Sequence, residues 1–360
     1  MRQDTTRFLW GRLIGALGYF LYPKDHYSLY PESDHYSQKT GRFFNPLPDH
    51  SMDKLGVISA FWQMMFHSEK FMPNQPLPVQ KPNFSEFLAE SENAKFIWFG
   101  HSSLLARLDG KTVFIDPVFA KSVSPLPWMM RRFQPPPTSL AELPKVDWIV
   151  ISHNHYDHLD KAVIEHYRHL QNVRFITPLG VGELLKKWGI SPERVEQLDW
   201  WQARQIGDLT ITAVPARHNT GRGIFDRNKT LWAGYVFQTP TEKVYYSGDS
   251  AWGDGSQFHQ IAEHFGQFDL AFVENGQYNP TWIDNHMLPE QMVEAVKLLQ
   301  PKRVMPVHWG AYALSIHGWK APVERAVPLL KQIAMPVLTP QLGQVFDRQT
   351  KTEFWWQNVK

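Results

Sequence analysis

The chain has 360 residues and a formal net charge of +2, and it contains no cysteine. This length allows one large domain or two smaller ones with a substantial core. The near-neutral charge and the lack of basic runs argue against nucleic acid as a partner. The absence of cysteine excludes disulfides and thiolate metal sites, so that any metal ion must be held by His, Asp or Glu side chains.

The first part of the chain is rich in turn formers and shows little periodicity. We therefore expect an N-terminal extension over residues 1–85, packed on a core domain over residues 86–350, with a helix near Val57–His67. The apolar stretch Phe8–Tyr22 is interrupted by Arg12 and is shorter than the roughly 20 residues that cross a bilayer. It is either an arm packed on the body or an interfacial helix, and it has no clear signal-peptide cleavage site.

Regular structure is predicted to begin with a meander of short strands at Phe96–Phe99, Leu104–Leu108 and Thr112–Ile115. Asp109-Gly110 is a tight-turn signal between the second and third of these strands. The segment Pro125–Pro137 is rich in proline and large apolar residues, and we expect a surface loop near the mouth of the site.

Strands and helices alternate in the rest of the chain. The further predicted strands are Trp148–Ile151, Arg174–Thr177, Val195–Leu198, Leu209–Val214, Leu231–Gln238, Lys243–Tyr246, Leu270–Glu274 and Arg303–Val307. The predicted helices are Lys161–His169, Val181–Trp188, Gln257–His264, Pro289–Leu299 and Pro322–Ile333. Hairpins followed by strand–helix alternation, twice over, predict an α/β fold with two sheets and helices outside them.

The densest group of metal-ligating side chains follows the apolar run Trp148–Ile151, where a buried strand is expected to end. It contains His153, His155, Asp157 and His158. Side chains two apart share a face in extended geometry, so the first two histidines point together, whereas the last two residues can turn to a second point. Burying four such groups without compensation is costly. The pattern therefore predicts two metal ions.

Three later strands each end at one more potential ligand, namely His218, Asp249 and His308. Each alone is compatible with an ordinary core or surface residue, but their order after the main cluster indicates one set. Open coordination by His nitrogen and carboxylate oxygen is typical of hydrolytic zinc sites. We predict one ion held by His153, His155 and His218 and a second held by Asp157, His158 and His308, with Asp249 bridging the two.

These residues resemble the metallo-β-lactamase superfamily, whose H-x-H-x-D-H signature is matched by His153, His155, Asp157 and His158. Finer motifs, over roughly residues 40–345, are similar to the branch of N-acylphosphatidylethanolamine-hydrolysing phospholipase D. They are Gly100-His101-Ser102-Ser103, Asp116-Pro117, Pro215-Ala216-Arg217-His218, Gly248-Asp249-Ser250, His286-Met287-Leu288-Pro289 and Val307-His308-Trp309-Gly310. The resemblance implies a four-layer αβ/βα sandwich with a dinuclear site, usually of zinc, between the sheet edges.

The branch also implies an activity, namely metal-dependent hydrolysis of N-acylphosphatidylethanolamine to N-acylethanolamine and phosphatidic acid. In that reaction Asp249 would hold the metal pair, Asp157 would orient the nucleophile, and His286 is a candidate acid. Two divalent ions can activate a water and clamp the attacking and leaving oxygens. The ligands suit zinc, and iron or manganese would also be compatible.

Four further residues are candidates for supporting roles. Asp116 and Asp160 are candidates for fixing imidazole tautomers, with a turn or helix-cap role as the alternative. Arg217 and Arg222 are candidates for a phosphate contact, because guanidinium matches phosphate geometry. Solvated loop cations are the alternative for both arginines.

Two other functions remain open at the level of sequence. The same metals could hydrolyse a soluble lactone or a sugar-phosphate ester, or the chain could be a non-catalytic metal-binding sensor or partner protein. We expect a cytoplasmic protein with a phospholipid or another small-molecule substrate and peripheral contact with a membrane. The sequence does not determine the oligomeric state, and a homodimer is one open alternative.

Overall fold

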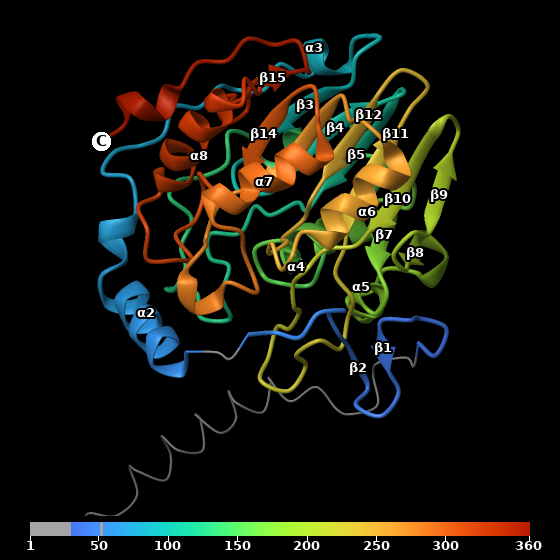
Figure 1. The fold of residues 1–360 in the computed structure, drawn as a ribbon. Helices are drawn as coiled ribbons and strands as arrows, with labels where there is room; N and C mark the ends of the chain where they lie inside the picture. The colour runs from blue at the N-terminus through green and yellow to red at the C-terminus, as the bar shows by residue number, and fades with distance from the viewer. Residues whose placement is uncertain (1–29, 51–52) are drawn as a thin grey trace, which may run out of the picture.

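The computed structural model describes residues 30–50 and 53–360. Two β-sheets face each other, and helices cover their outer faces (Figure 1). The seven-stranded sheet has the order β15-β3-β4-β5-β6-β7-β8, with strands at Val345–Phe346, Lys95–Trp98, Leu104–Leu108, Lys111–Ile115, Trp148–Val150, Arg174–Pro178 and Val195–Leu198. The six-stranded sheet has the order β14-β13-β12-β11-β10-β9, with strands at Val304–Val307, Leu270–Glu274, Lys243–Tyr246, Gly234–Gln238, Leu209–Val214 and Ala203–Ile206.

The core lies in three apolar layers, one between the sheets and one under each set of helices. Strand β3 shows how the sequence produces them, since successive side chains of a strand point to opposite faces. Phe96 and Trp98 enter the layer between the sheets, whereas Ile97 enters the outer layer. The ring of Phe96 meets that of Phe272 from strand β13 at a centroid distance of 5.0 Å, which joins the two sheets.

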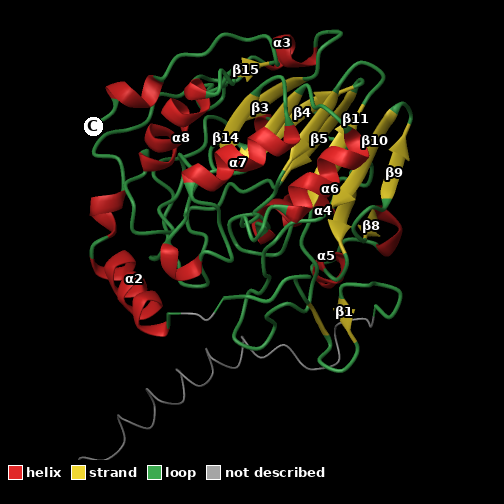
Figure 2. Ribbon diagram, in the orientation of Figure 1, coloured by secondary structure: helices red, strands yellow, loops and turns green. Residues whose placement is uncertain are grey.

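The helices are divided between the two outer faces, as Figure 2 shows for α6 and α7 in front of the strands. The seven-stranded sheet is covered by α3 (Phe84–Leu88), α4 (Lys161–Arg168) and α5 (Val181–Lys187). The six-stranded sheet is covered by α6 (Ser256–Phe265), α7 (Pro289–Leu299) and α8 (Ala321–Gln332). The predicted four-layer αβ/βα sandwich is thereby confirmed.

Most predicted strands and helices agree with the structure to within two residues, and the differences have local causes. Helix α2 spans Lys54–Phe66, three residues before the predicted start, because the Asp53 carboxylate accepts a 3.0 Å hydrogen bond from the Gly56 N–H and caps the first turn. Strands β9 and β15 were not predicted. They are edge strands, one mostly exposed and the other only two residues long, so neither carries the apolar alternation of a central strand.

Strand β11 begins at Gly234, three residues later than predicted. The residues before it are apolar, but their backbone N–H groups bond to loops that follow strands of the seven-stranded sheet. The Leu231 N–H donates to the Leu179 carbonyl, and the Ala233 N–H donates to the Ser152 carbonyl. Hydrophobicity alone cannot distinguish a buried segment of this kind, which connects the two sheets, from a strand.

The described part of the N-terminal extension contacts the core near the predicted site. It contains the short hairpin β1–β2 (Tyr36–Ser37 and Arg42–Phe43), and the Phe43 N–H donates to the Asn228 carbonyl at 2.7 Å. The Asn45 side-chain amide donates to the His218 carbonyl at 2.9 Å. The apolar stretch at residues 8–22 lies outside the described residues. Across residues 30–50 and 53–360, no helix combines the length and apolarity needed to cross a bilayer.

Candidate metal centre

The predicted ligands meet at one edge of the sandwich because of the strand directions. Strands β5, β6 and β7 are parallel, as are β12, β13 and β14. The carboxyl ends of parallel strands lie at one edge of a sheet, where ligands of open α/β sheets bind. The loops after β6, β10, β12 and β14 deliver His153, His218, Asp249 and His308 respectively, and all four side chains are buried.

The loop between β6 and α4 is folded by its own hydrogen bonds. The N–H groups of His158 and Leu159 both donate to the His155 carbonyl, at 3.1 and 2.8 Å. This turn reverses the chain after His155, so that His153 and His155 lie at one point and Asp157 and His158 at another. It ends at Asp160, whose carboxylate accepts from the Ala162 N–H at 2.9 Å and caps α4.

The first group of ligands, which we call the histidine half, consists of His153, His155 and His218. The His155 Nδ1 lies 2.9 Å from the His153 Nε2 and 3.2 Å from the His218 Nε2. A tetrahedral zinc ion with Zn–N bonds of about 2.1 Å would separate its nitrogen ligands by roughly 3.4 Å. The three ring nitrogens are therefore close to the spacing that one cation requires.

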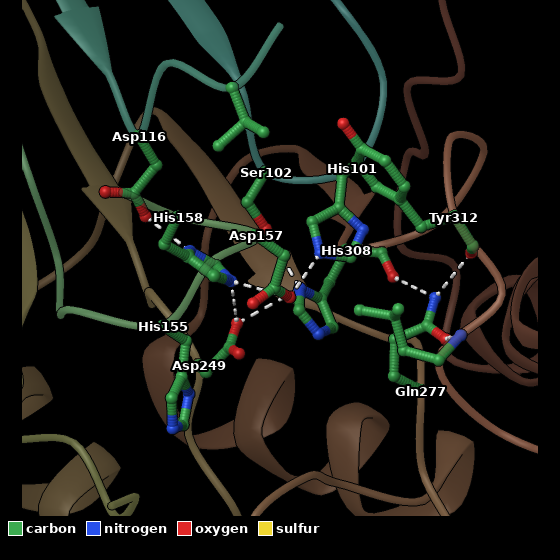
Figure 3. A network of polar contacts seen from close by, with 12 residues as sticks. His101, Ser102, Asp116, His155, Asp157, His158, Asp249, Gln277, His308 and Tyr312 are labelled. Atoms are coloured by element: carbon green, nitrogen blue, oxygen red, sulfur yellow. Dashed lines mark hydrogen bonds and ion pairs between the residues drawn. The ribbon is translucent and has the colours of Figure 1, made fainter. Parts of the chain in front are cut away.

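The second group, which we call the carboxylate half, consists of Asp157, His158, Asp249 and His308 (Figure 3). The His158 Nε2 lies 3.5 Å from the Asp157 Oδ2 and 3.1 Å from the Asp249 Oδ1. The same Asp249 oxygen lies 3.1 Å from the His308 Nδ1. Ligand atoms from three different loops thus converge on a second point.

Asp249 has one carboxylate oxygen near each half. Its Oδ1 faces His158 and His308, as given above, and its Oδ2 lies 3.7 Å from the Nε2 atoms of both His153 and His218. The side chain is 2% exposed. A buried carboxylate with one oxygen toward each group has the geometry of a bridging ligand.

Unsatisfied buried atoms show that this residue set fits cations. Within the described part of the chain, the His158 Nε2, the Asp249 Oδ1 and the His308 Nε2 are buried without a hydrogen-bond partner. Buried polar atoms of folded proteins are almost always paired. These three atoms belong to one cluster of side chains that are good ligands for a divalent ion, and metal coordination would satisfy them.

Electrostatics differs between the two halves. Burial lowers the pKa of His155 to about 4, with the nearby Asp157 acting in the opposite direction. Burial also lowers the pKa values of His153 and His218 well below their usual range, and the neighbouring imidazoles lower them further. The histidine half is therefore uncharged at neutral pH, which is the form that binds metal ions.

The carboxylate half carries charge. Burial acts to lower the pKa of His158, but the adjacent Asp249, Asp157 and Asp116 carboxylates raise it well above its usual range. Burial raises the pKa of Asp249 to about 6, against the effect of His158. In this half a histidine surrounded by carboxylates holds positive charge, at a place that also suits a cation.

Neighbouring groups fix the orientation of the ligand rings, as is usual around protein-bound metals. The His158 Nδ1 bonds Asp116 at 2.7 Å, so the predicted contact of Asp116 with a ligand imidazole is present in the structure. The His218 Nδ1–H donates to the Asn285 carbonyl at 2.9 Å. In both rings this leaves Nε2 directed toward the cluster.

His101 is a supporting residue to which we assigned no role from the sequence. Its Nε2 bonds the Asp157 Oδ2 at 2.8 Å, and its ring packs on that of His308 at a centroid distance of 4.1 Å (Figure 3). The backbone φ angles of His101 (56°), Asp116 (40°) and His308 (71°) are all positive. Non-glycine residues adopt this region at a cost of about 1–3 kcal/mol, and such strain clusters at functional sites. Strain of this kind cannot be read from the sequence.

The structure decides between the alternatives for three supporting residues, and for Asp160 it shows the helix cap. Asp160 caps α4 and accepts from the Phe119 N–H at 3.0 Å, and it has no hydrogen bond to a ligand imidazole. The Arg217 guanidinium binds Asp284 at 2.7 Å and the carbonyls of residues 47 and 48. Arg222 donates to the carbonyls of residues 154 and 159, and its guanidinium lies 3.8 Å from the Tyr156 ring centroid. Both arginines brace loops and are not available to a phosphate.

His286 lies beside the metal ligands. Its ring stacks on His308 at a centroid distance of 5.0 Å and lies 5.3 Å from that of His218. Its Nδ1 bonds the Glu274 Oε2 at 2.9 Å. Glu274 was not recognised in the sequence, where it is only the last residue of an apolar strand.

Comparison with known proteins agrees with this geometry. The family model of the beta-lactamase superfamily domain matches residues 111–309. An uncharacterized protein of Mycobacterium tuberculosis is 37% identical over 327 residues, which cover 89% of this chain and 87% of the relative. N-acyl-phosphatidylethanolamine-hydrolyzing phospholipase D 1 of Caenorhabditis elegans is 33% identical over 259 residues, covering 69% and 72%. The mitochondrial protein of that name from Saccharomyces cerevisiae is 27% identical over 344 residues, covering 87% and 71%.

Solved structures share the fold. Igni18, a metallo hydrolase from Ignicoccus hospitalis, superposes with a TM-score of 0.56 at 22% identity, over 72% of this chain and all of that one. CmlA, a diiron β-hydroxylase from Streptomyces venezuelae, superposes with a TM-score of 0.55 at 20% identity. The match covers 72% of this chain and 55% of CmlA. The chain belongs to the metallo-β-lactamase superfamily. Within that superfamily it is a metal-dependent hydrolase.

Proposed function

We propose that the chain is a zinc-dependent phosphodiesterase of the phospholipase D type, which hydrolyses N-acylphosphatidylethanolamine to N-acylethanolamine and phosphatidic acid. The observation that carries the proposal is the position of Asp249 between two groups of ligand atoms. A dinuclear site of this kind suits displacement at phosphorus, where attacking and leaving oxygens both need stabilisation. The two phospholipase D relatives support this choice of substrate.

We assign His153, His155 and His218 to one ion and Asp157, His158 and His308 to the other, with Asp249 shared. When bound, two divalent ions supply Lewis-acid stabilisation of phosphoryl oxygens and lower the pKa of coordinated water. Zinc is the proposed metal, because the ligands are imidazoles and carboxylates without a thiolate. The same ligand types also serve iron, so metal analysis is part of the test.

The protein's own residues supply orientation and proton transfer. The His101 imidazole bonds one Asp157 oxygen, which fixes that carboxylate relative to the site and lets it orient the attacking water. His286 lies next to the ligands, and burial lowers its pKa while the nearby Asp249 and Asp157 carboxylates act in the opposite direction. In its protonated form it would serve as the acid for the leaving oxygen. The apolar core between the sheets lies beneath the cluster and keeps bulk water from that side.

The test is turnover by protein purified and reloaded with measured amounts of zinc, iron or manganese. We expect release of N-acylethanolamine from N-acylphosphatidylethanolamine, with about two zinc ions per chain. Lactones and sugar-phosphate esters are assayed in parallel. Turnover of a lactone without turnover of the lipid would overturn the proposed substrate and favour a hydrolase of soluble compounds. Metal binding without any turnover would favour the non-catalytic sensor.

We also propose peripheral contact with a phospholipid membrane through a surface that we call the apolar edge. It is formed by one side of α2 and the loop at residues 126–133, and its strongly exposed side chains are Leu55, Ile58, Phe61, Trp62, Phe66 and Trp128. A groove of about 530 Å³ runs between the helix and the loop. Exposed apolar patches of this kind mark interaction surfaces, and tryptophan suits the membrane interface.

Liposome co-sedimentation tests the membrane contact. Trp62→Glu with Phe66→Glu, made in the full-length chain, should reduce binding to phosphatidylethanolamine vesicles at least tenfold. Leu170→Glu, at an exposed leucine outside the apolar edge, is the matched control and should bind like the wild type. Equal binding by all three proteins would show that the apolar edge does not contact lipid.

A further inference from the structure

Glu274 is a fully buried carboxylate at the carboxyl end of β13, and its side chain is 0% exposed. Both of its oxygens have partners. Oε2 lies 2.9 Å from the His286 Nδ1, and Oε1 accepts from the Met287 N–H at 2.6 Å. Burying an acidic side chain is costly unless it is paired. A fully buried glutamate beside the site therefore indicates a role for its contacts.

The partner of Glu274 is a partly exposed histidine of the site that is not one of the proposed metal ligands. The His286 side chain is 13% exposed, whereas those of the ligands His218 and His308 are each 1% exposed. The His286 ring packs against both of these ligands. Because Nδ1 bonds Glu274, Nε2 is the ring nitrogen that is left to interact with a bound molecule.

The loop that carries His286 is anchored on both sides of the histidine. Before it, the Trp282 indole N–H donates to the Gln277 carbonyl at 2.8 Å, and Asp284 pairs with Arg217. After it, the Met287 N–H binds Glu274. Glu274 thus holds both the ring and the adjacent backbone of His286, which sets the position and the rotation of the imidazole.

We propose that Glu274 is a positioning residue that fixes His286 so that its Nε2 delivers a proton to the leaving oxygen. This rests on the hydrolase function proposed above. The oxygen of a water forms a bond to phosphorus, and the P–O bond to the leaving alcohol breaks. The leaving oxygen takes the proton from the His286 Nε2, and the proton that the water gives up returns to the imidazole through solvent.

A direct metal-binding role for Glu274 fits the contacts less well. Glu274 lies close enough to Asp249, His286 and His308 to share an ion with them. However, one of its oxygens is already engaged by the ring of His286 and the other by the Met287 N–H. Positioning also predicts that metal content survives removal of the carboxylate, whereas a ligand role predicts that it falls. Metal analysis of the variants therefore separates the two roles.

The experiment compares two phosphodiesters that share phosphatidic acid but differ in the leaving group. One releases N-acylethanolamine, a poor leaving group that needs a proton, and the other releases p-nitrophenol, which needs none. His286→Ala should lower kcat by about 10²–10⁴-fold for the first substrate, the usual range for general acid catalysis, and much less for the second. Glu274→Ala and Glu274→Gln should show the same dependence on the leaving group, to a smaller extent.

Two further measurements separate positioning from a merely structural role. The double variant Glu274→Ala with His286→Ala should be no slower than His286→Ala alone, because the carboxylate acts through the ring. Glu242→Gln is the matched control, since Glu242 is a buried carboxylate, 1% exposed, that pairs with Arg348 away from the site. It should lower stability without any leaving-group dependence.

Equal slowing of both substrates in Glu274→Ala, or multiplication of the two single effects in the double variant, would overturn the inference. So would loss of metal from a folded Glu274→Gln protein. The proposed substrate can be wrong while the proposed role of Glu274 is right. If the wild-type chain hydrolyses carboxylic esters in place of phosphodiesters, phenol and alkyl esters replace the two substrates, and the same comparison decides the role of Glu274.

Discussion

The two halves of the metal centre are built in different ways. The histidine half consists of three imidazoles that burial keeps uncharged, and its neighbours are a backbone carbonyl and a hydroxyl. The carboxylate half combines two aspartates with two histidines, and Asp116 and His101 support it from behind. A cation held by the first half would keep most of its positive charge, whereas the carboxylates of the second half would largely neutralise the charge of a cation held there.

Because of this difference, we expect the two halves to have different roles. With an ion in each half, the less neutralised ion would be the stronger Lewis acid, and the ion beside two carboxylates would be the more tightly held. Asp249 couples the two, since each of its oxygens serves a different half. The halves can therefore be taken apart by substitution, and the size of each effect should depend on which half is touched.

The largest effect is expected for Asp249→Ala, which removes the shared ligand. A bound metal ion is worth several kcal/mol of transition-state stabilisation, which corresponds to about 10²–10⁴-fold in rate. Loss of both ions should therefore lower kcat/KM by more than about 10⁴-fold. Metal content by mass spectrometry should fall from two ions toward zero. Retention of one full equivalent would show that the halves bind independently.

His155→Ala removes a ligand from the histidine half only. We expect about one metal ion per chain and a loss in kcat/KM of about 10²–10⁴-fold, since the carboxylate half keeps all of its ligands. His259→Ala, at an exposed histidine on α6, is the control and should leave metal content and rate unchanged. Complete metal loss in His155→Ala would contradict the separation of the two halves.

A smaller effect is expected for Asp116→Asn, which changes the support of the carboxylate half. Asp116 bonds the His158 Nδ1 at 2.7 Å and accepts from the Tyr246 hydroxyl at 2.5 Å. Loss of such a partner costs about 10–100-fold in metal affinity or activity. Competition with a chelator should show one weakened ion and one unchanged. Equal weakening of both ions would argue against the assignment of Asp116 to one half.

The smallest effect on activity is expected for Arg217→Met, behind the histidine half. The variant loses the charged hydrogen bond to Asp284, so unfolding should require on the order of 2 kcal/mol less, as measured with urea. Metal content should stay at two ions. Arg227→Met is the control, because its exposed pair with Asp49 at 3.9 Å is worth about 0–1 kcal/mol. If the two variants were equally stable, Arg217 would not stabilise the fold through its contact with Asp284.

Much of this protein is determined locally in the sequence. The ligand residues are visible because they follow short apolar runs, and strands that end in His or Asp place them at a sheet edge whatever the details of packing. The turn at His155 needs only neighbouring residues, so the split of His153–His158 between two points could also be predicted. The alternation of β3 and the caps of the helices are local as well.

The contacts of the residues that surround the ligands were determined by the tertiary structure. Arg217 was a candidate phosphate ligand because guanidinium matches phosphate geometry. In the structure its donors are occupied by the carbonyls of residues 47 and 48 and by Asp284. Glu274 and His286 are 12 residues apart and meet only because the loop after β13 folds back over the site. Contacts of this kind depend on which loops share an edge, a property of the packed sheets that no local pattern contains.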